Sequence, residues 1–109
     1  MKLVIAVVQD KDGNKLRDAL IAQNFRATKL ASTGGFLRSG NTTFLIGVED
    51  HRLDQVLDLI KINCRAREQL MTPVVPLDGS SEPASAYPVP VQVGGATVFV
   101  VDILRFEQY

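Results

Sequence analysis

The chain is 109 residues long, the length of a single domain, and its hydrophobic fraction of 46% is ordinary for a globular protein. Its 12 Lys and Arg residues balance 12 Asp and Glu residues, so the formal net charge is zero. This balance argues against non-specific binding of nucleic acid, which grows with the number of phosphates that a basic surface neutralises.

Cysteine, histidine and apolar runs exclude further classes of protein. The single cysteine, Cys64, cannot form an intramolecular disulfide, and with only one histidine, His51, a zinc site is implausible. The apolar run at the N-terminus is too short for a signal peptide, and no segment approaches the roughly 20 apolar residues of a membrane span. We therefore expect a soluble cytoplasmic protein without a metal or a resident cofactor.

The first part of the chain predicts a strand followed by a helix. Residues Lys2–Val8 (KLVIAVV) are an almost continuous β-branched run, typical of a central strand buried on both faces. Charged residues and Gly13 end this strand, and Asp10 or Asp12 is expected to cap the helix that follows. The helix is predicted from residues at helical spacing, which are Leu16, Ala19, Leu20 and Gln23.

Two further strands are predicted after this helix. Asn24 is expected at the C-terminal cap of the helix. Phe25–Ala31 alternates with a period of two, which predicts a half-buried strand with Arg26 and Thr28 on the same face. A Gly-rich connection over residues 33–40 leads to a third strand at Thr42–Val48.

The second part of the chain repeats the pattern with a long connection. Asp50 is expected to cap a second helix. Residues 67–90 are interpreted as a long flexible loop, because all 5 prolines fall between 72 and 90. Ala96–Val101 is the last predicted strand. The second helix is predicted from its apolar stripe, which consists of Leu53, Val56, Leu57 and Ile60.

This order of elements predicts a single α+β domain. Each helix is preceded by a strand that ends in an acidic residue (LVIAVVQD and FLIGVED), and this similarity is a weak internal repeat. Two such units in one sheet give the βαββαβ, ferredoxin-like sandwich, in which an antiparallel sheet carries two helices on one face.

The sequence offers only weak support for a catalytic site. A nucleophile needs a base beside it, but His51 is interpreted as an exposed first-turn residue and Cys64 as a buried core thiol. The sequence contains neither a Walker-A lysine motif nor G-x-G-x-x-G. An acylphosphatase is disfavoured because the loop QDKDGN after the first strand is acidic and lacks arginine, so it would repel a phosphate.

The segment from Asn24 to Asn41 is the most informative part of the sequence. Arg26 offers a fork of donors for paired phosphate oxygens, and Thr28 adds a hydroxyl on the same strand face. The Gly34–Gly35 pair permits the main-chain amides to approach an anion or a base edge closely. The apolar residues Phe36 and Leu37 suit the flat face of a purine. Two plainer interpretations stay open, namely that Arg26 pairs with a surface acid and that Phe36 and Leu37 pack in a subunit contact.

Four stretches of this sequence closely resemble the PII-like cyclic di-AMP receptor family of Gram-positive bacteria. They are NFRATKLASTGGFLRSGNTTFLIGV, REQL after the second helix, VQVGGATVFV near the end, and the terminal FEQY. The resemblance extends from Lys2 to the C-terminus. It implies a PII-like homotrimer that binds cyclic di-AMP in clefts between subunits. It also implies signal transduction without catalysis, through loops that ligand binding would order, towards an unidentified downstream protein.

The resemblance also implies roles for individual residues. Arg26 and Thr28 are expected to contact the phosphate and ribose, with Asn24 and Ala27 beside them. Gly35, Phe36 and Leu37 are expected to cover one adenine, with Asn41 at the same pocket. The other side of the pocket is expected to be lined by Gly47, Gly94, Gly95 and Phe99, with Gln108 reaching across the subunit interface.

Two other functions remain as alternatives. One is a PII-type regulator that binds ATP or another adenine nucleotide, which the short 33–40 loop disfavours. The other is a small phosphate-ester enzyme, which the missing nucleophile and base disfavour.

Overall fold

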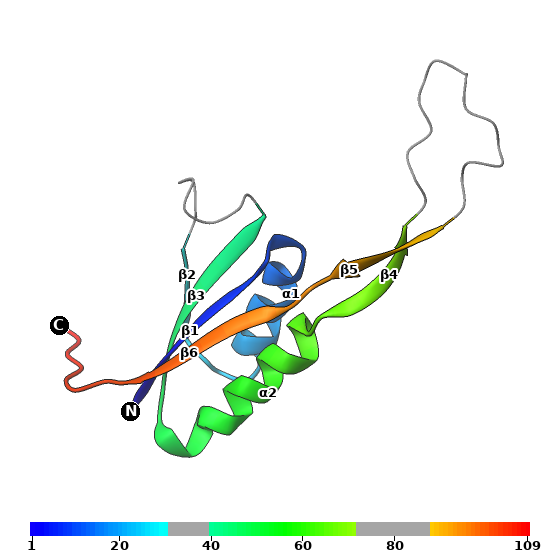
Figure 1. Ribbon diagram of the computed structural model, residues 1–109. Coiled ribbons are helices and arrows are strands. Elements are labelled where there is room, and N and C mark those ends of the chain that lie inside the picture. Colours follow the sequence, from blue (N-terminus) through cyan, green and yellow to red (C-terminus); the bar gives the residue numbers. More distant parts are fainter. Residues whose placement is uncertain (31–39, 72–87) are drawn as a thin grey trace.

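The computed structural model describes residues 1–30, 40–71 and 88–109 (Figure 1). Residues Gly35, Phe36 and Leu37 therefore lie outside the described part of the chain. The elements are, in chain order, β1 (Lys2–Gln9), α1 (Asp10–Ala22), β2 (Ala27–Leu30), β3 (Asn41–Val48), a 3-10 turn (Asp50–Arg52), α2 (Leu53–Cys64), β4 (Arg67–Met71), β5 (Val89–Val93) and β6 (Ala96–Asp102).

The main sheet has the strand order β2-β3-β1-β6, and all of its neighbouring strands are antiparallel. Helices α1 and α2 both lie on one side of it (Figure 1). This arrangement confirms the predicted ferredoxin-like fold. Strand β1 is central, as expected, and its register aligns Ile5 with Leu45 on β3 and with Phe99 on β6.

The core lies between this sheet and the two helices. Alternate residues of β1 and β3 point into it, because side chains alternate between the two faces of a strand. Both predicted helical stripes supply residues to it. The buried apolar side chains are Val4, Ala6, Val8, Leu16, Leu20, Phe25, Phe44, Ile46, Val48, Val56, Ile60 and Cys64.

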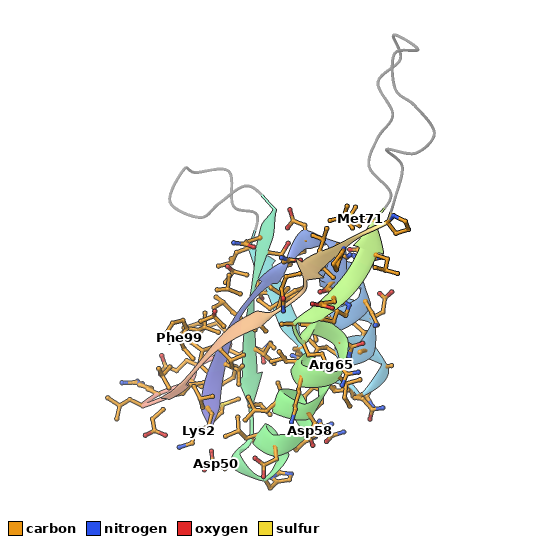
Figure 2. All side chains as sticks on the ribbon, turned by 45° about the vertical axis from the view of Figure 1, so that its right-hand side comes forward. Lys2, Asp50, Asp58, Arg65, Met71 and Phe99 are labelled. Atoms are coloured by element: carbon orange, nitrogen blue, oxygen red, sulfur yellow. The ribbon has the colours of Figure 1, made fainter. Side chains whose placement is uncertain are left out.

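The other face of the sheet is not covered, which corrects the expectation that β1 is buried on both faces. Leu3, Ile5 and Val7 point away from the helices and are only half-buried. Figure 2 shows Phe99 on this open face, where 55% of it is exposed. An apolar run buried on both faces needs a second layer, and no described segment of the chain supplies one.

The predicted N-terminal caps are wrong, and the C-cap of α1 is Gln23, one residue before the predicted Asn24. Helix α1 begins at Asp10 directly after β1, and neither Gln9 at its N-cap nor Arg52 at that of α2 makes a side-chain cap hydrogen bond. Asp10 and Asp12 lie in the first turn of α1, and Asp50 begins the 3-10 turn. Asn24 follows α1 with a φ of 62°, the left-handed conformation that often follows a C-terminal cap.

The long loop expected at residues 67–90 is shorter than predicted, because its two ends pair as strands. Strands β4 and β5 form a separate antiparallel hairpin in which Leu70 lies opposite Pro90. Proline is tolerated in an edge strand because its missing amide can face solvent, so the prolines gave a misleading loop signal here. Residues 72–87 lie outside the described part of the chain.

Candidate functional site

A pocket of about 480 Å³ lies at one end of the open sheet face, where the start of β2 meets the C-terminal residues. Arg26, Ala27, Thr28, Gly47 and Gln108, all predicted as site residues, line it together. The other lining residues are Met1, Leu3, Leu45, Ile103 and Phe106. The pocket therefore combines one guanidinium and one hydroxyl with an apolar floor, a composition that suits an anion carrying a flat apolar group.

The sequence motif did not identify this apolar lining. Leu3 on β1 and Leu45 on β3 face the pocket because both belong to the open-face set of their strands. The alternation of each strand gives that set, but the motif does not say which strands are neighbours.

The exposure and the ion pairs around Arg26 indicate that its side chain is available to a ligand. It is exposed, and among the residues that the structure describes no ion pair involves it. This disfavours the plainer interpretation in which Arg26 pairs with a surface acid. Thr28 lies opposite Leu45, on the open face of the sheet.

Gly47 leaves the floor of the pocket open. A Cβ added to Gly47 would meet only the terminal methyl of Met1, at 3.9 Å. The backbone at Gly47 does not have a positive φ, so nothing in the strand itself demands glycine. The missing side chain instead leaves open space above the sheet at this point.

The side chains of the C-terminal residues 105–109 alternate between two sides of the chain. Arg105 donates to Glu107 Oε1 at 2.6 and 3.0 Å, and the Tyr109 hydroxyl donates to Glu107 Oε2 at 2.5 Å. The hydrogen bonds from Tyr109 and Arg105 lower the pKa of Glu107 below its ordinary value, so it accepts as a carboxylate. The residues between them, Phe106 and Gln108, line the pocket.

A smaller pocket of about 260 Å³ adjoins the first and shares Met1, Arg26 and Gly47 with it. Asn24, another predicted site residue, lines this second pocket beside Arg52. Arg26 therefore borders both pockets. Thr28 lines the larger pocket, and Asn24 lines the smaller one.

Asn41, Gly94 and Gly95 gather elsewhere, around a pocket of about 340 Å³ at the Gln9 end of β1. Leu3 and Gln9 are six residues apart on β1, which corresponds to roughly 20 Å along a strand. Within one chain the predicted site residues thus form two groups at opposite ends of the same face. Phe99 lines neither pocket and lies between them, opposite Ile5.

The Gly94–Gly95 turn has both of its amides occupied. Gly94 N–H donates to Gln9 Oε1 at 2.7 Å, and Gly95 N–H donates to the Cys64 carbonyl at 2.5 Å. Both glycines have a positive φ. A ligand at this turn would therefore find neither of these amides free to donate a hydrogen bond.

The remaining reactive side chains match the interpretations made from the sequence. Cys64 is fully buried, and burial raises the pKa of its thiol to about 11, which makes it an inert core residue. His51 is exposed in the 3-10 turn.

In the described ranges, no three His, Cys, Asp or Glu side chains gather as metal ligands. No helix there is long and apolar enough to cross a membrane.

Comparison with known proteins gives a consistent result over the whole chain. A family model described as cyclic-di-AMP receptor matches residues 1–109. Among solved structures, a functionally unknown protein from Pediococcus pentosaceus is 54% identical, with a TM-score of 0.81. That match covers 99% of this chain and 96% of the Pediococcus chain.

Proposed function

Because the chain belongs to the cyclic-di-AMP receptor family, we propose that it is a second-messenger sensor that holds cyclic di-AMP in clefts between subunits. Arg26 and Thr28 of one subunit bind the phosphate and ribose, and the apolar floor of the same pocket packs against the base. The protein signals without catalytic turnover.

The observation that carries this proposal is the separation of the site residues into two groups. The Arg26 group and the Asn41 group lie at opposite ends of one face, roughly 20 Å apart along β1. One small ligand that contacts both groups must take them from different subunits. The uncovered apolar face between the groups supports self-association, because association would remove it from water, and the family resemblance makes the expected assembly a homotrimer.

The signal then passes through the segments on either side of the cleft. Gly40 lies immediately before Asn41, and its carbonyl accepts a hydrogen bond from the Asp10 amide at 2.6 Å. The β4–β5 hairpin joins the same end through Gly94. A ligand that contacts Asn41 and Gly94 therefore acts on both of these points and changes the surface that a downstream protein meets. The loops expected to carry this change, 31–39 and 72–87, lie outside the described residues.

The first experiment is thermal melting with cyclic di-AMP, cyclic di-GMP, ATP and AMP in parallel. A ligand at about one hundred times its Kd stabilises each site by about 2.7 kcal/mol, which is several degrees for a domain of this size. We expect a shift with cyclic di-AMP alone. A shift with ATP alone would replace the proposal with a PII-type regulator, and no shift at all would contradict both.

Two further measurements test the cleft itself. Arg26→Ala removes a charge-assisted contact and should raise the Kd for cyclic di-AMP at least about tenfold, which is roughly 1.4 kcal/mol. Sedimentation should give a trimer, and Phe99→Asp should weaken it, because it places a charge on the apolar open face. A monomeric wild-type protein would refute the inter-subunit cleft.

A further inference from the structure

Arg52 contacts the chain segment that leads into β2, although it is distant from that segment in the sequence. Its Nη2 donates to the Gln23 carbonyl at 2.8 Å. Its guanidinium carbon lies 3.9 Å from the centre of the Phe25 ring. Arg52 is half-buried in these contacts. One planar side chain thus holds both ends of the short segment from Gln23 to Phe25.

This segment needs to be held because it changes direction within three residues. Asn24 is the only non-glycine residue with a positive φ in the described part of the chain. Its amide and that of Phe25 donate back to Ile21 and Leu20 of α1, at 3.0 and 2.9 Å. These bonds satisfy the amides of the turn, whereas the Gln23 carbonyl takes its partner from Arg52.

The turn determines the position from which the Arg26 side chain projects. Phe25 is anchored in the core, with 6% of it exposed, and Arg26 follows it directly into the pocket. Arg52 and Arg26 also line the same 260 Å³ pocket. The backbone direction that Arg52 fixes is therefore the one from which the Arg26 and Thr28 side chains project.

We propose that Arg52 is a positioning residue for ligand binding, acting through the Gln23–Phe25 turn on Arg26 and Thr28. The inference rests on the proposed function, since it assumes that Arg26 binds the ligand. Arg52 itself has its Nη2 directed to Gln23 and its flat face on Phe25, so its contribution is geometric rather than a second charge on the phosphate. A site prepared in this way loses less conformational freedom on binding.

The test compares Arg52→Lys and Arg52→Gln with wild type by calorimetric titration with cyclic di-AMP at 20 °C. Lysine keeps the charge but loses the planar fork and the stacking. We expect both variants to raise the Kd by about fivefold to tenfold and to shift the amide resonances of residues 24–28 in the ligand-free protein. Full affinity in Arg52→Lys together with a loss in Arg52→Gln would show a charge effect and overturn the proposal.

Two controls separate positioning from a general loss of stability or charge. Arg17→Gln removes an equal charge from α1, where Arg17 pairs with its neighbour Asp18, and should leave the Kd unchanged. Ile60→Val weakens the core on α2 about two helical turns beyond Arg52 and leaves the contacts of Arg52 with Gln23 and Phe25 in place, so it should lower the Tm and leave the Kd unchanged. A Kd increase in Ile60→Val equal to that of the Arg52 variants would overturn the proposal.

Arg26→Ala distinguishes failure of this inference from failure of the proposed function. If Arg26→Ala weakens binding and neither Arg52 variant does, the positioning role is wrong and the sensor stands. If wild type does not bind cyclic di-AMP, the sensor is wrong. The resonances of residues 24–28 still decide whether Arg52 fixes the turn, and unshifted resonances would refute that as well.

Discussion

Arg67 on β4 and Asp12 in the first turn of α1 form a two-point ion pair, with Nη2–Oδ1 and Nη1–Oδ2 distances of 2.8 and 3.3 Å. The Asp12 side chain is 3% exposed, so the pair ties the hairpin to the core rather than to the surface. The hydrogen bond to Asp12 raises the pKa of Arg67 above its ordinary value. Arg67 also donates to the Arg65 carbonyl at 3.1 Å, directly beneath Gly94.

The substitution Arg67→Met should destabilise the protein substantially. It leaves the Asp12 carboxylate, whose side chain is almost completely buried, without its partner, and this loss lowers the free energy of unfolding. Chemical denaturation measures this change. The matched control is Arg105→Met in the exposed Arg105–Glu107 pair, which should leave the midpoint almost unchanged. Equal effects of the two substitutions would contradict a structural role for the Asp12 pair.

Hydrogen exchange adds a local measurement to the same pair. The hairpin meets α1 through Arg67 and through a hydrogen bond of 2.7 Å from Lys11 to Gln69. Arg67→Met should therefore speed the exchange of the β4 and β5 amides before it affects those of β1. Uniform acceleration throughout the chain would indicate a global effect instead.

Gly94→Ala should destabilise the protein more than Gly95→Ala. At Gly94 a Cβ would lie 2.5 Å from the Arg65 carbonyl oxygen and 2.6 Å from Arg67 Nη1, whereas at Gly95 it would meet nothing within 4 Å. Both positions have a positive φ, so each alanine costs about 1–2 kcal/mol of backbone strain. The displaced neighbours of Gly94 add about 1–3 kcal/mol. Denaturation midpoints that rank the two variants in the opposite order would contradict this account.

Gly47→Val should separate binding from folding. Valine suits a β-strand, and a Cβ at this position meets only the flexible end of Met1, so we expect a Tm close to that of wild type. The same side chain fills the floor of the 480 Å³ pocket and should raise the Kd for cyclic di-AMP at least about tenfold, or roughly 1.4 kcal/mol. Gly47→Ala should have a smaller effect in titration. An unchanged Kd for the valine variant would remove Gly47 from the site.

The Cys64 thiol should be unreactive in the folded protein. A thiol reagent at pH 8 should label it only after denaturation, because burial removes both access and the thiolate form. Its pKa rises from an ordinary 9.0 to about 11 on folding. The unfolded chain therefore loses this proton first, and the thiol's contribution to stability falls as the pH rises from about 9 to about 11. Cys64→Ala should show a flatter pH dependence in that window, and rapid labelling of native protein would refute the burial.

Much of the fold follows from local patterns in the sequence. The β-branched run at Lys2–Val8 and the stripe Leu53–Ile60 predicted a strand and a helix, because period and side-chain shape act over a few residues. The hairpin was missed for the complementary reason. Pro88 and Pro90 indicate a loop locally, and only pairing with Arg67–Met71 makes that segment a strand.

The site divides in the same way. The sequence by itself indicated the residues that we propose to carry the chemistry, since a guanidinium and a hydroxyl two residues apart can be read at Arg26 and Thr28, and the family resemblance added Gly47. Only the tertiary structure decided that these three share a pocket with Gln108 while Asn41 and Gly94 lie at the other end of β1. Strand order and register bring distant residues together through hydrogen bonds between strands, and no pattern within a single strand encodes its neighbours.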